Sequence, residues 1–211
     1  PVSGIFSCEF QRAEQNWEQT FFMPVLAKDG NAIPCQVEKE ESNINLDWRK
    51  RVVFSATLAP SSLNRFDCSF AVLPSRPEPS FDRDDFVFAN EDMSIAIDRR
   101  TGLIERYEVG GIPLLLPNSA RAMAVPDTDD PWHMDSPFYP REGVPFRLMT
   151  REEAGAFCGA SQPRAPVRVI EDGAVRTVVE SLLVYGNSSL CVRYAIPKSG
   201  TRIELSRKVY W

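Results

Sequence analysis

The sequence predicts an all-β protein, in which a small β-sandwich is followed by part of a larger β-unit. Runs that alternate apolar and polar residues flank a tight turn at four places, which is the pattern of antiparallel hairpins. Glycine at each turn predicts the positive φ angle that hairpin turns commonly need. Helical periodicity is weak by comparison and is confined to residues 10–21 and 150–160. The four turns are centred on Asp29-Gly30, Gly110-Gly111, Asp172-Gly173 and Ser199-Gly200.

The order of the elements predicts two domains. Residues 1–80 hold short strand-like segments, the last of which is RFDCSFAVL, where Phe66, Cys68, Phe70 and Val72 share one face. Residues 73–85, LPSRPEPSFDRDD, contain three prolines and cannot form a central strand. Longer strand-like runs follow this proline-rich boundary. We therefore expect a small β-sandwich over residues 1–80 and a larger β-unit over residues 81–211.

Composition and charge exclude several classes of partner. The chain has 211 residues, of which 43% are hydrophobic and 25% are charged, as in ordinary soluble globular proteins. Its net charge of -5 and thinly spread basic residues leave no basic surface for nucleic acid or an anionic membrane. No apolar run approaches the roughly 18 residues that cross a bilayer. The charged run EKEESNINLDWRKR, residues 38–51, is interpreted as a solvated sheet edge rather than a binding patch.

The five cysteines predict reduced thiols and a cytoplasmic location. Their number is odd and none forms a Cys-x-x-Cys pair, so neither a disulfide framework nor a zinc site is indicated. Cys8, Cys68 and Cys191 lie in alternating runs, where we expect them to be small buried apolar residues.

The segment Pro126–Pro140, PDTDDPWHMDSPFYP, gathers aromatic, acidic and imidazole side chains between prolines. Its histidine is the only one in the chain and has no partners for a zinc cage. A calcium loop would need glycine and glutamate where Trp132 and Phe138 stand. The adjacent Asp129 and Asp130 point to opposite sides of an extended chain, so they do not form the opposed carboxylate pair of a glycosidase. We predict no metal site and no catalytic residue in this segment. The open alternatives are a Ca²⁺ or Mg²⁺ site completed by distant ligands and a carboxylate pair of Asp129 or Asp130 with Asp135.

Two functions of this segment stay open. An aromatic face beside hydrogen-bonding groups is a suitable lining for a carbohydrate site, because sugars have apolar C–H faces and hydroxyl edges. The alternative is a proline-stiffened structural loop, with a buried tryptophan and aspartates that cap turns. The candidate substrate-binding residues are Asp129, Asp130, Trp132, His133, Asp135 and Tyr139.

Two longer stretches carry motifs in a fixed order. The first, FANEDMSIAIDRRTGLIERYEVGGIPLL, holds the motifs Asn90-Glu91, Ile97-Asp98, Thr101-Gly102 and Leu103-Ile104. The second, VIEDGAVRTVVESLLVYGNSSLCVRYAIPKSGTRIELSRKVYW, has a Glu-x-Gly turn, a long strand, a Ser-initiated strand and a strand that ends in aromatic-Trp. Together they resemble the large β-domain of α-mannosidases in glycoside hydrolase family 38. The resemblance covers residues 86–211 best, and residues 1–80 fit as the small β-domain before it.

The resemblance implies a small β-sandwich followed by a galactose-mutarotase-like β-supersandwich, of which residues 81–211 form the N-terminal portion. In that family the nucleophilic aspartate and the His/Asp zinc site belong to a separate N-terminal α/β barrel. No catalytic, metal-binding or cofactor-binding residue is therefore carried over to this chain. Its expected partners are the catalytic barrel of the same polypeptide and a mannoside. Because the chain begins at Pro1 and stops at Trp211 within a strand-like run, we expect an excised piece of a longer enzyme.

The sequence thus predicts a non-catalytic β-sandwich region of an α-mannosidase-like glycoside hydrolase, which supports the catalytic barrel and lines the sugar cleft. The alternative is a stand-alone carbohydrate-binding or structural interaction module. Aldose-epimerase-like enzymes share the supersandwich but resemble one another in needing two histidines, and this chain has one.

Overall fold

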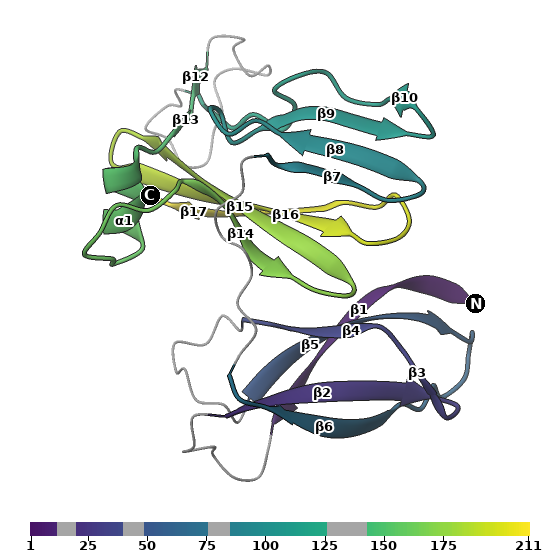
Figure 1. The fold of residues 1–211 in the computed structure, drawn as a ribbon. Coiled ribbons are helices and arrows are strands. Elements are labelled where there is room, and N and C mark those ends of the chain that lie inside the picture. The colour runs from purple at the N-terminus through teal and green to yellow at the C-terminus, as the bar shows by residue number, and fades with distance from the viewer. Residues whose placement is uncertain (12–19, 40–48, 76–84, 126–142) are drawn as a thin grey trace, which may run out of the picture. The chain divides into compact units, whose positions relative to one another are not determined.

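The computed structural model describes residues 1–11, 20–39, 49–75, 85–125 and 143–211. These residues form several antiparallel sheets and one short helix, so the predicted all-β class is confirmed (Figure 1). Within the described ranges, no helix is long and apolar enough to cross a membrane. Most of the weak helical segment 10–21 and of the proline-rich boundary 73–85 lies outside the described residues.

The chain divides into two compact units. The first contains residues 1–80 together with 170–177 and 197–199. The second contains residues 81–169, 178–196 and 200–211. Two short turn segments from late in the sequence therefore belong to the first unit.

The first unit contains two three-stranded antiparallel sheets that share one core. One sheet has the order β1-β5-β4, formed by β1 (Val2–Gln11), β5 (Arg49–Leu58) and β4 (Cys35–Glu38). The other has the order β3-β2-β6, formed by β3 (Asn31–Ala32), β2 (Phe21–Lys28) and β6 (Asp67–Leu73). Leu26 on β2 packs with Val52 and Phe54 on β5, so the core takes residues from both sheets.

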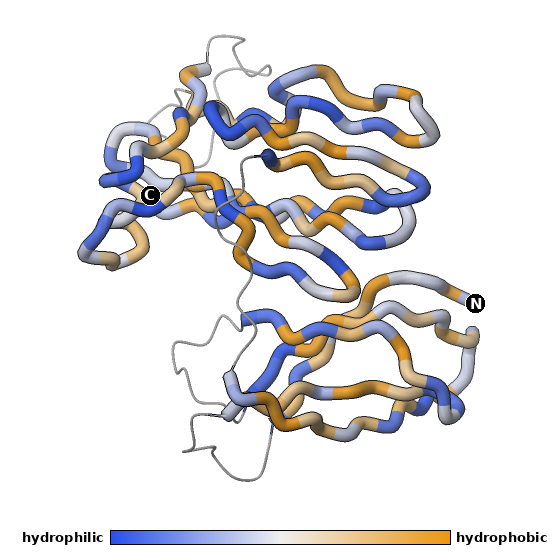
Figure 2. Tube along the Cα trace, viewed as in Figure 1, coloured by the Kyte–Doolittle hydropathy of each residue, from blue (hydrophilic) through white to orange (hydrophobic). Residues whose placement is uncertain are grey.

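Alternation along the strands builds this core. Val52 and Phe54 point into it, and the intervening Val53 points to the opposite face of its sheet because successive side chains of a strand alternate. Figure 2 shows hydrophobic and hydrophilic residues alternating along the strands. The predicted turn between β2 and β3 is confirmed, since Asp29 and Gly30 both have positive φ, 52° and 79°.

The second unit contains a four-stranded sheet and a five-stranded sheet. The four-stranded sheet has the order β10-β9-β8-β7, formed by β7 (Val87–Ala89), β8 (Met93–Ile97), β9 (Ile104–Val109) and β10 (Ile112–Pro113). The five-stranded sheet consists of β13 (Arg147–Leu148), β14 (Val167–Asp172), β15 (Arg176–Tyr185), β16 (Ser188–Pro197) and β17 (Glu204–Tyr210). Two short strands, β11 (Met123–Ala124) and β12 (Val144–Pro145), pair with each other. Residues 170–177, at the turn between β14 and β15, belong to the first unit.

The core of the second unit joins its two larger sheets. Ile95 on β8 packs in one cluster with Val179 on β15 and Tyr194 on β16. Gly110 and Gly111 lie in the turn between β9 and β10, and Gly200 lies in the turn between β16 and β17. All three have positive φ, which confirms the two predicted hairpins.

The turns of the four-stranded sheet are held by polar side chains. The Asn90 carboxamide oxygen accepts hydrogen bonds from the backbone N–H groups of Asp92 (2.8 Å) and Met93 (3.0 Å). The Asp98 carboxylate accepts from the N–H of Arg100 (2.8 Å). Gly102 has a φ of 71°, and a Cβ there would lie 2.9 Å from Leu148 Cδ1 and 3.0 Å from Ser181 Cβ, so only glycine fits.

The weak helical signal at residues 150–160 is confirmed as one short helix, α1 (Arg151–Phe157). Thr150 caps its N-terminus by accepting from the N–H of Glu153, whose carboxylate accepts in return from the N–H of Thr150. The side-chain hydrogen bond from Arg147, at 2.6 Å, is the main cause that lowers the pKa of Glu153 to about 2.

The prediction that three cysteines are buried holds for one of them. Cys191 on β16 is buried and Cys8 on β1 is half-buried. The prediction is wrong for Cys68, which is exposed because β6 lies at the edge of its sheet.

The buried Tyr194 hydroxyl is expected to stabilise the second unit. It is fully buried and donates a 2.8 Å hydrogen bond to the carbonyl oxygen of Gly102, which fastens β16 to the Thr101-Gly102 turn. Burial raises the pKa of Tyr194 to about 12, so the hydroxyl stays protonated and keeps donating at neutral pH. We expect Tyr194→Phe to lower the free energy of unfolding by about 1–2 kcal/mol, because the buried carbonyl loses its partner. Urea denaturation checks this, with Tyr185→Phe as the control, since Tyr185 is exposed.

Candidate functional site

The six candidate sugar-binding residues, Asp129, Asp130, Trp132, His133, Asp135 and Tyr139, lie outside the described residues. The structure therefore neither brings them together nor separates them. Among the residues that it does describe, no group of three or more His, Cys, Asp and Glu side chains is arranged to hold a metal ion. Two buried clusters of charged and polar side chains are present instead, one in each unit.

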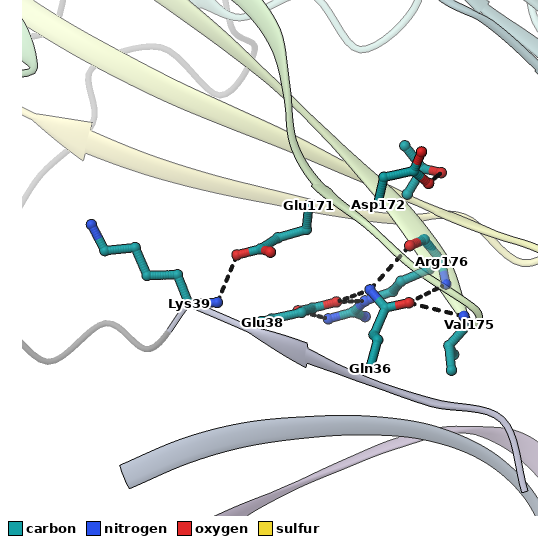
Figure 3. Close-up of polar contacts among 8 residues, drawn as sticks. Gln36, Glu38, Lys39, Glu171, Asp172, Val175 and Arg176 are labelled. Carbon is teal, nitrogen blue, oxygen red and sulfur yellow. Dashed lines mark hydrogen bonds and ion pairs between the residues drawn. The ribbon is translucent and has the colours of Figure 1, made fainter. Parts of the chain in front are cut away.

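The cluster of the first unit lies on the outer face of β4 (Figure 3). Cys35 packs against the core of the unit, so Gln36 and Glu38 alternate with it and point to the opposite face. There they contact Val175 and Arg176, at the turn between β14 and β15. We call Gln36, Glu38 and Arg176 the hairpin clamp.

Gln36 is hydrogen-bonded through both ends of its carboxamide. Its Oε1 atom accepts from the N–H groups of Val175 and Arg176, each at 2.9 Å. Its Nε2 atom donates to the Arg176 carbonyl oxygen at 3.0 Å and to Glu38 at 3.1 Å. This buried side chain thus replaces the backbone partners that a neighbouring strand would give to the hairpin turn.

Glu38 and Arg176 form a bidentate ion pair. Arg176 Nε lies 2.6 Å from Glu38 Oε1, and a terminal guanidinium nitrogen lies 2.7 Å from Oε2. The two side chains are only 6% and 9% exposed, so water does little to solvate either charge. Removal of one member of such a pair is costly, because the other member is then a buried charge that has lost its ion-pair partner.

Further bonds hold the ends of the same turn. Glu171 accepts a 2.6 Å hydrogen bond from the N–H of Lys39, which follows β4. Asp172 accepts from the Thr177 hydroxyl and from Lys198 Nζ, each at 2.7 Å. Both carboxylates therefore join segments of the chain to one another.

The structure corrects the interpretation of Gly173. The sequence predicted a positive φ at this glycine, but Gly173 is not among the glycines that have one. It is needed for space, because a Cβ there would lie 2.6 Å from Gln36 Oε1 and 2.8 Å from Gln36 Cβ. Close approach of the clamp, and not turn conformation, therefore requires glycine at this position.

The close approach at Gly173 leads to a second prediction. We expect Gly173→Ala to lower the free energy of unfolding by about 1–3 kcal/mol, because the added methyl group pushes Gln36 off its partners. The same change in a Gln36→Gly background should cost less than half as much. Thermal unfolding of the four proteins in this cycle measures the coupling. Equal costs in the two backgrounds would contradict the contact.

The cluster of the second unit is a charge triad on three adjacent strands. The carboxylate of Glu180, on β15, lies 2.7 Å from Arg168 on β14 and 3.2 Å from Arg193 on β16. The Cys191 thiol donates to the same carboxylate at 3.3 Å. Glu180 is buried, with a side chain 6% exposed.

Electrostatics fix the protonation states of the triad. Burial by itself raises the pKa of Glu180, but the attraction of Arg168 and Arg193 outweighs it and leaves this pKa below its ordinary value. Burial and the Glu180 carboxylate raise the pKa of Cys191 to about 12, so its thiol stays protonated and is a poor nucleophile. The cluster therefore contains fixed charges and no group that titrates near neutral pH, which suits a structural role better than acid–base catalysis.

Neither cluster was predicted from the sequence. Residues 38–51 were interpreted as a solvated edge, but Glu38 and Lys50 are buried, with 6% and 3% of their surface exposed. Glu38 is covered by the hairpin turn, and the Lys50 ammonium lies 3.8 Å from the centre of the Phe21 ring. Residues 40–48 of that run lie outside the described residues. The one sequence feature that pointed to the hairpin clamp is the alternation of Gln36 and Glu38 with apolar residues on β4. A strand with one solvated face has the same pattern, so the alternation does not indicate burial.

Comparison with known proteins yields no matching family model, no matching curated protein and no matching solved structure.

Proposed function

We propose that this chain is a non-catalytic β-sandwich region of an α-mannosidase-like glycoside hydrolase. In this proposal residues 1–80 form a small β-sandwich, and residues 81–211 form the N-terminal portion of a galactose-mutarotase-like supersandwich. The region supports a catalytic barrel in the same polypeptide, which supplies the nucleophilic aspartate and the zinc site. The intact enzyme hydrolyses α-mannosides in the cytoplasm.

The observation that carries this proposal is the role of the residues on which the family resemblance rests. Asn90 and Asp98 fasten the turns that flank β8. Gly102 closes the next turn, where its carbonyl oxygen receives the Tyr194 hydroxyl bond. The motif residues therefore act in an antiparallel β-fold, as expected if the resemblance reflects a shared architecture.

The two buried clusters support a role as a scaffold. In the hairpin clamp and in the charge triad, oppositely charged side chains pair across separate segments at short distances. Pairs of this kind fix the geometry of strands, because any displacement exposes an uncompensated charge. A support for a catalytic domain needs such fixed geometry.

The proposed role of the segment 126–140 is to line one side of the sugar cleft of the intact enzyme. Trp132 and Tyr139 supply apolar faces for a sugar ring, while Asp129, Asp130, His133 and Asp135 supply hydrogen-bonding groups. A single side of a cleft holds a sugar weakly without the opposite side. We therefore expect mannose oligosaccharides to leave the tryptophan fluorescence of the isolated chain unchanged. Quenching that Trp132→Ala abolishes and Trp17→Ala leaves intact would instead favour a stand-alone carbohydrate-binding module.

Isolation of the natural polypeptide tests the assignment. An antibody against this chain is used to purify the polypeptide from its source cells, and mass spectrometry then determines the full sequence. We expect a catalytic barrel in the same polypeptide and hydrolysis of an aryl α-mannoside that a chelator stops and zinc restores. A polypeptide without such a barrel, or one that leaves α-mannosides intact, would overturn the proposal.

A further inference from the structure

A run of apolar residues, 112–117, lies on the surface of the second unit. Its sequence is IPLLLP, and every residue in it is exposed. The aliphatic side chains of Ile112, Leu114, Leu115 and Leu116 are 64%, 55%, 39% and 80% exposed, in that order. We call these four side chains the leucine patch. Surface runs of this length are uncommon unless they serve a function, because exposed apolar side chains favour association.

The backbone holds the leucine patch in place at both ends. At its start, β10 pairs with β9, and the N–H of Leu114 donates to the Tyr107 carbonyl oxygen at 2.9 Å. At its end, the Leu116 carbonyl oxygen accepts from the N–H of Ser119 at 3.2 Å and from the Ser119 hydroxyl at 2.6 Å. The patch is therefore a preformed surface, which loses little conformational entropy when a partner covers it.

We propose that the leucine patch packs against an apolar face of the catalytic barrel in the same polypeptide. This inference rests on the proposed function, which assigns such a barrel to that polypeptide. Three properties of the patch select this occupant. They are the lack of charge, the exposed area and the position of the prolines.

The lack of charge fits an apolar protein face. Residues 110–120, GGIPLLLPNSA, contain no charged side chain, although 25% of the residues of the chain are charged. An anionic membrane surface would be recognised by basic side chains around the leucines. The patch also lacks the aromatic and arginine side chains that dominate the hot spots of transient complexes. Uncharged aliphatic surface is instead typical of permanent interfaces.

The area of the patch fits a domain of the same polypeptide better than a free partner. The exposed side chains offer on the order of 400 Å² of apolar surface, the size of a functional patch on a soluble protein. A stable complex of separate proteins buries about 800 Å² on each partner. Domains of one chain bury about 600–1,500 Å², counted over both sides. A domain joined to the same chain has a high effective concentration, so the smaller area suffices for it.

The prolines make an added strand a poor occupant. Among the described strands, β10 is the outermost of its sheet. A strand paired to its outer edge would need backbone N–H groups that point away from β9. Pro113 and Pro117 have no N–H, and that of Leu114 already donates within the sheet. The leucine patch is therefore suited to side-chain packing against a separate face and not to continuation of the sheet.

Thiol accessibility tests whether the patch is covered. Leu116→Cys is introduced into the natural polypeptide and into the chain of residues 1–211, and labelling by a maleimide is followed for each peptide by mass spectrometry. We expect the new thiol to react at least about tenfold more slowly in the natural polypeptide, because the interface must open before the reagent enters. Equal rates at position 116 in the two proteins would overturn the proposal.

Two controls accompany this comparison. Leu63→Cys is the matched variant, since Leu63 is 97% exposed on the first unit, and its thiol should react at similar rates in both proteins. The midpoint of urea denaturation of residues 1–211 should be unchanged by Leu116→Cys, because the Leu116 side chain is 80% exposed. An unchanged midpoint shows that the labelling rates report on coverage and not on a loss of folding.

A photo-cross-link identifies the occupant. Benzoylphenylalanine in place of Leu116 should form a link to a peptide of the catalytic barrel when the natural polypeptide is irradiated. A link to other β-structure of the polypeptide, or to a second copy, would overturn this choice of occupant. The proposed function would survive these results, because it fails only if the polypeptide has no barrel or leaves α-mannosides intact.

Discussion

Removal of the Glu38 carboxylate by Glu38→Ala is expected to lower the free energy of unfolding of the first unit by about 3–5 kcal/mol. The ion pair with Arg176 is bidentate, with distances of 2.6 and 2.7 Å, and both side chains are buried. Without Glu38, the buried Arg176 guanidinium loses its bidentate carboxylate partner. Hydrogen exchange followed by mass spectrometry should show faster exchange in β4 and in residues 170–177.

A double substitution distinguishes the effect of the two charges from the effect of the side-chain volume. Glu38→Leu combined with Arg176→Met removes both charges and keeps most of the volume, so most of the lost stability should return. Protection against hydrogen exchange should recover in β4 and in residues 170–177. A cost below about 1 kcal/mol for Glu38→Ala would contradict the burial of the pair, since exposed pairs contribute about that much or less.

Removal of the Glu180 charge is expected to be similarly costly in the second unit. Glu180→Gln leaves Arg168 and Arg193 close together without the carboxylate that both contact. We expect a loss of about 3–5 kcal/mol at pH 7, measured by urea denaturation. Glu105→Gln, on an exposed position of β9, is the control and should have little effect.

The same substitution changes the dependence of stability on pH. The pKa of Glu180 in the folded protein lies below its ordinary value of 4.5. The unfolded chain therefore binds the proton more readily, and the charged carboxylate contributes its full stability above about pH 4.5. This contribution is lost as the pH falls through the lower folded pKa. The difference in unfolding free energy between the parent protein and Glu180→Gln should be constant at neutral pH and shrink in acid. A difference that is independent of pH would contradict the assigned charge state.

Local turn chemistry made much of the fold predictable. The Asp29-Gly30 and Gly110-Gly111 pairs lie between alternating runs, and both have the positive φ angles of tight hairpins. The helix α1 was predicted only weakly because it has seven residues, and the structure shows that its Thr150 and Glu153 form a capping box. These features depend on residues within a few positions of one another, so a single sequence contains the information.

Long-range contacts were the part that a single sequence could not reveal. Gln36 and Arg176 lie 140 positions apart, and no local pattern indicates that they meet. A buried Glu38 has the same sequence environment as an exposed one, so alternation placed it on a solvated face. Gly173 was assigned to a turn conformation because the clash with Gln36 is visible only once the two segments are together.

The candidate sugar-binding segment remains a prediction of the sequence. Trp132 and its neighbours lie outside the described residues, and the two clusters that the structure reveals are built from other parts of the chain. Both clusters hold fixed charges that join strands. This is the physical basis for the proposal that the described residues support a catalytic domain.

The assay of the purified chain against an aryl α-mannoside tests this assignment most directly. The chain, residues 1–211, is incubated with the substrate in the presence and absence of zinc, and release of the aryl group is followed by absorbance. We predict no hydrolysis above the rate in buffer, because the proposal places the nucleophile and the metal ligands in a separate barrel. Hydrolysis that co-elutes with the chain and keeps a constant specific activity through further purification would contradict this account.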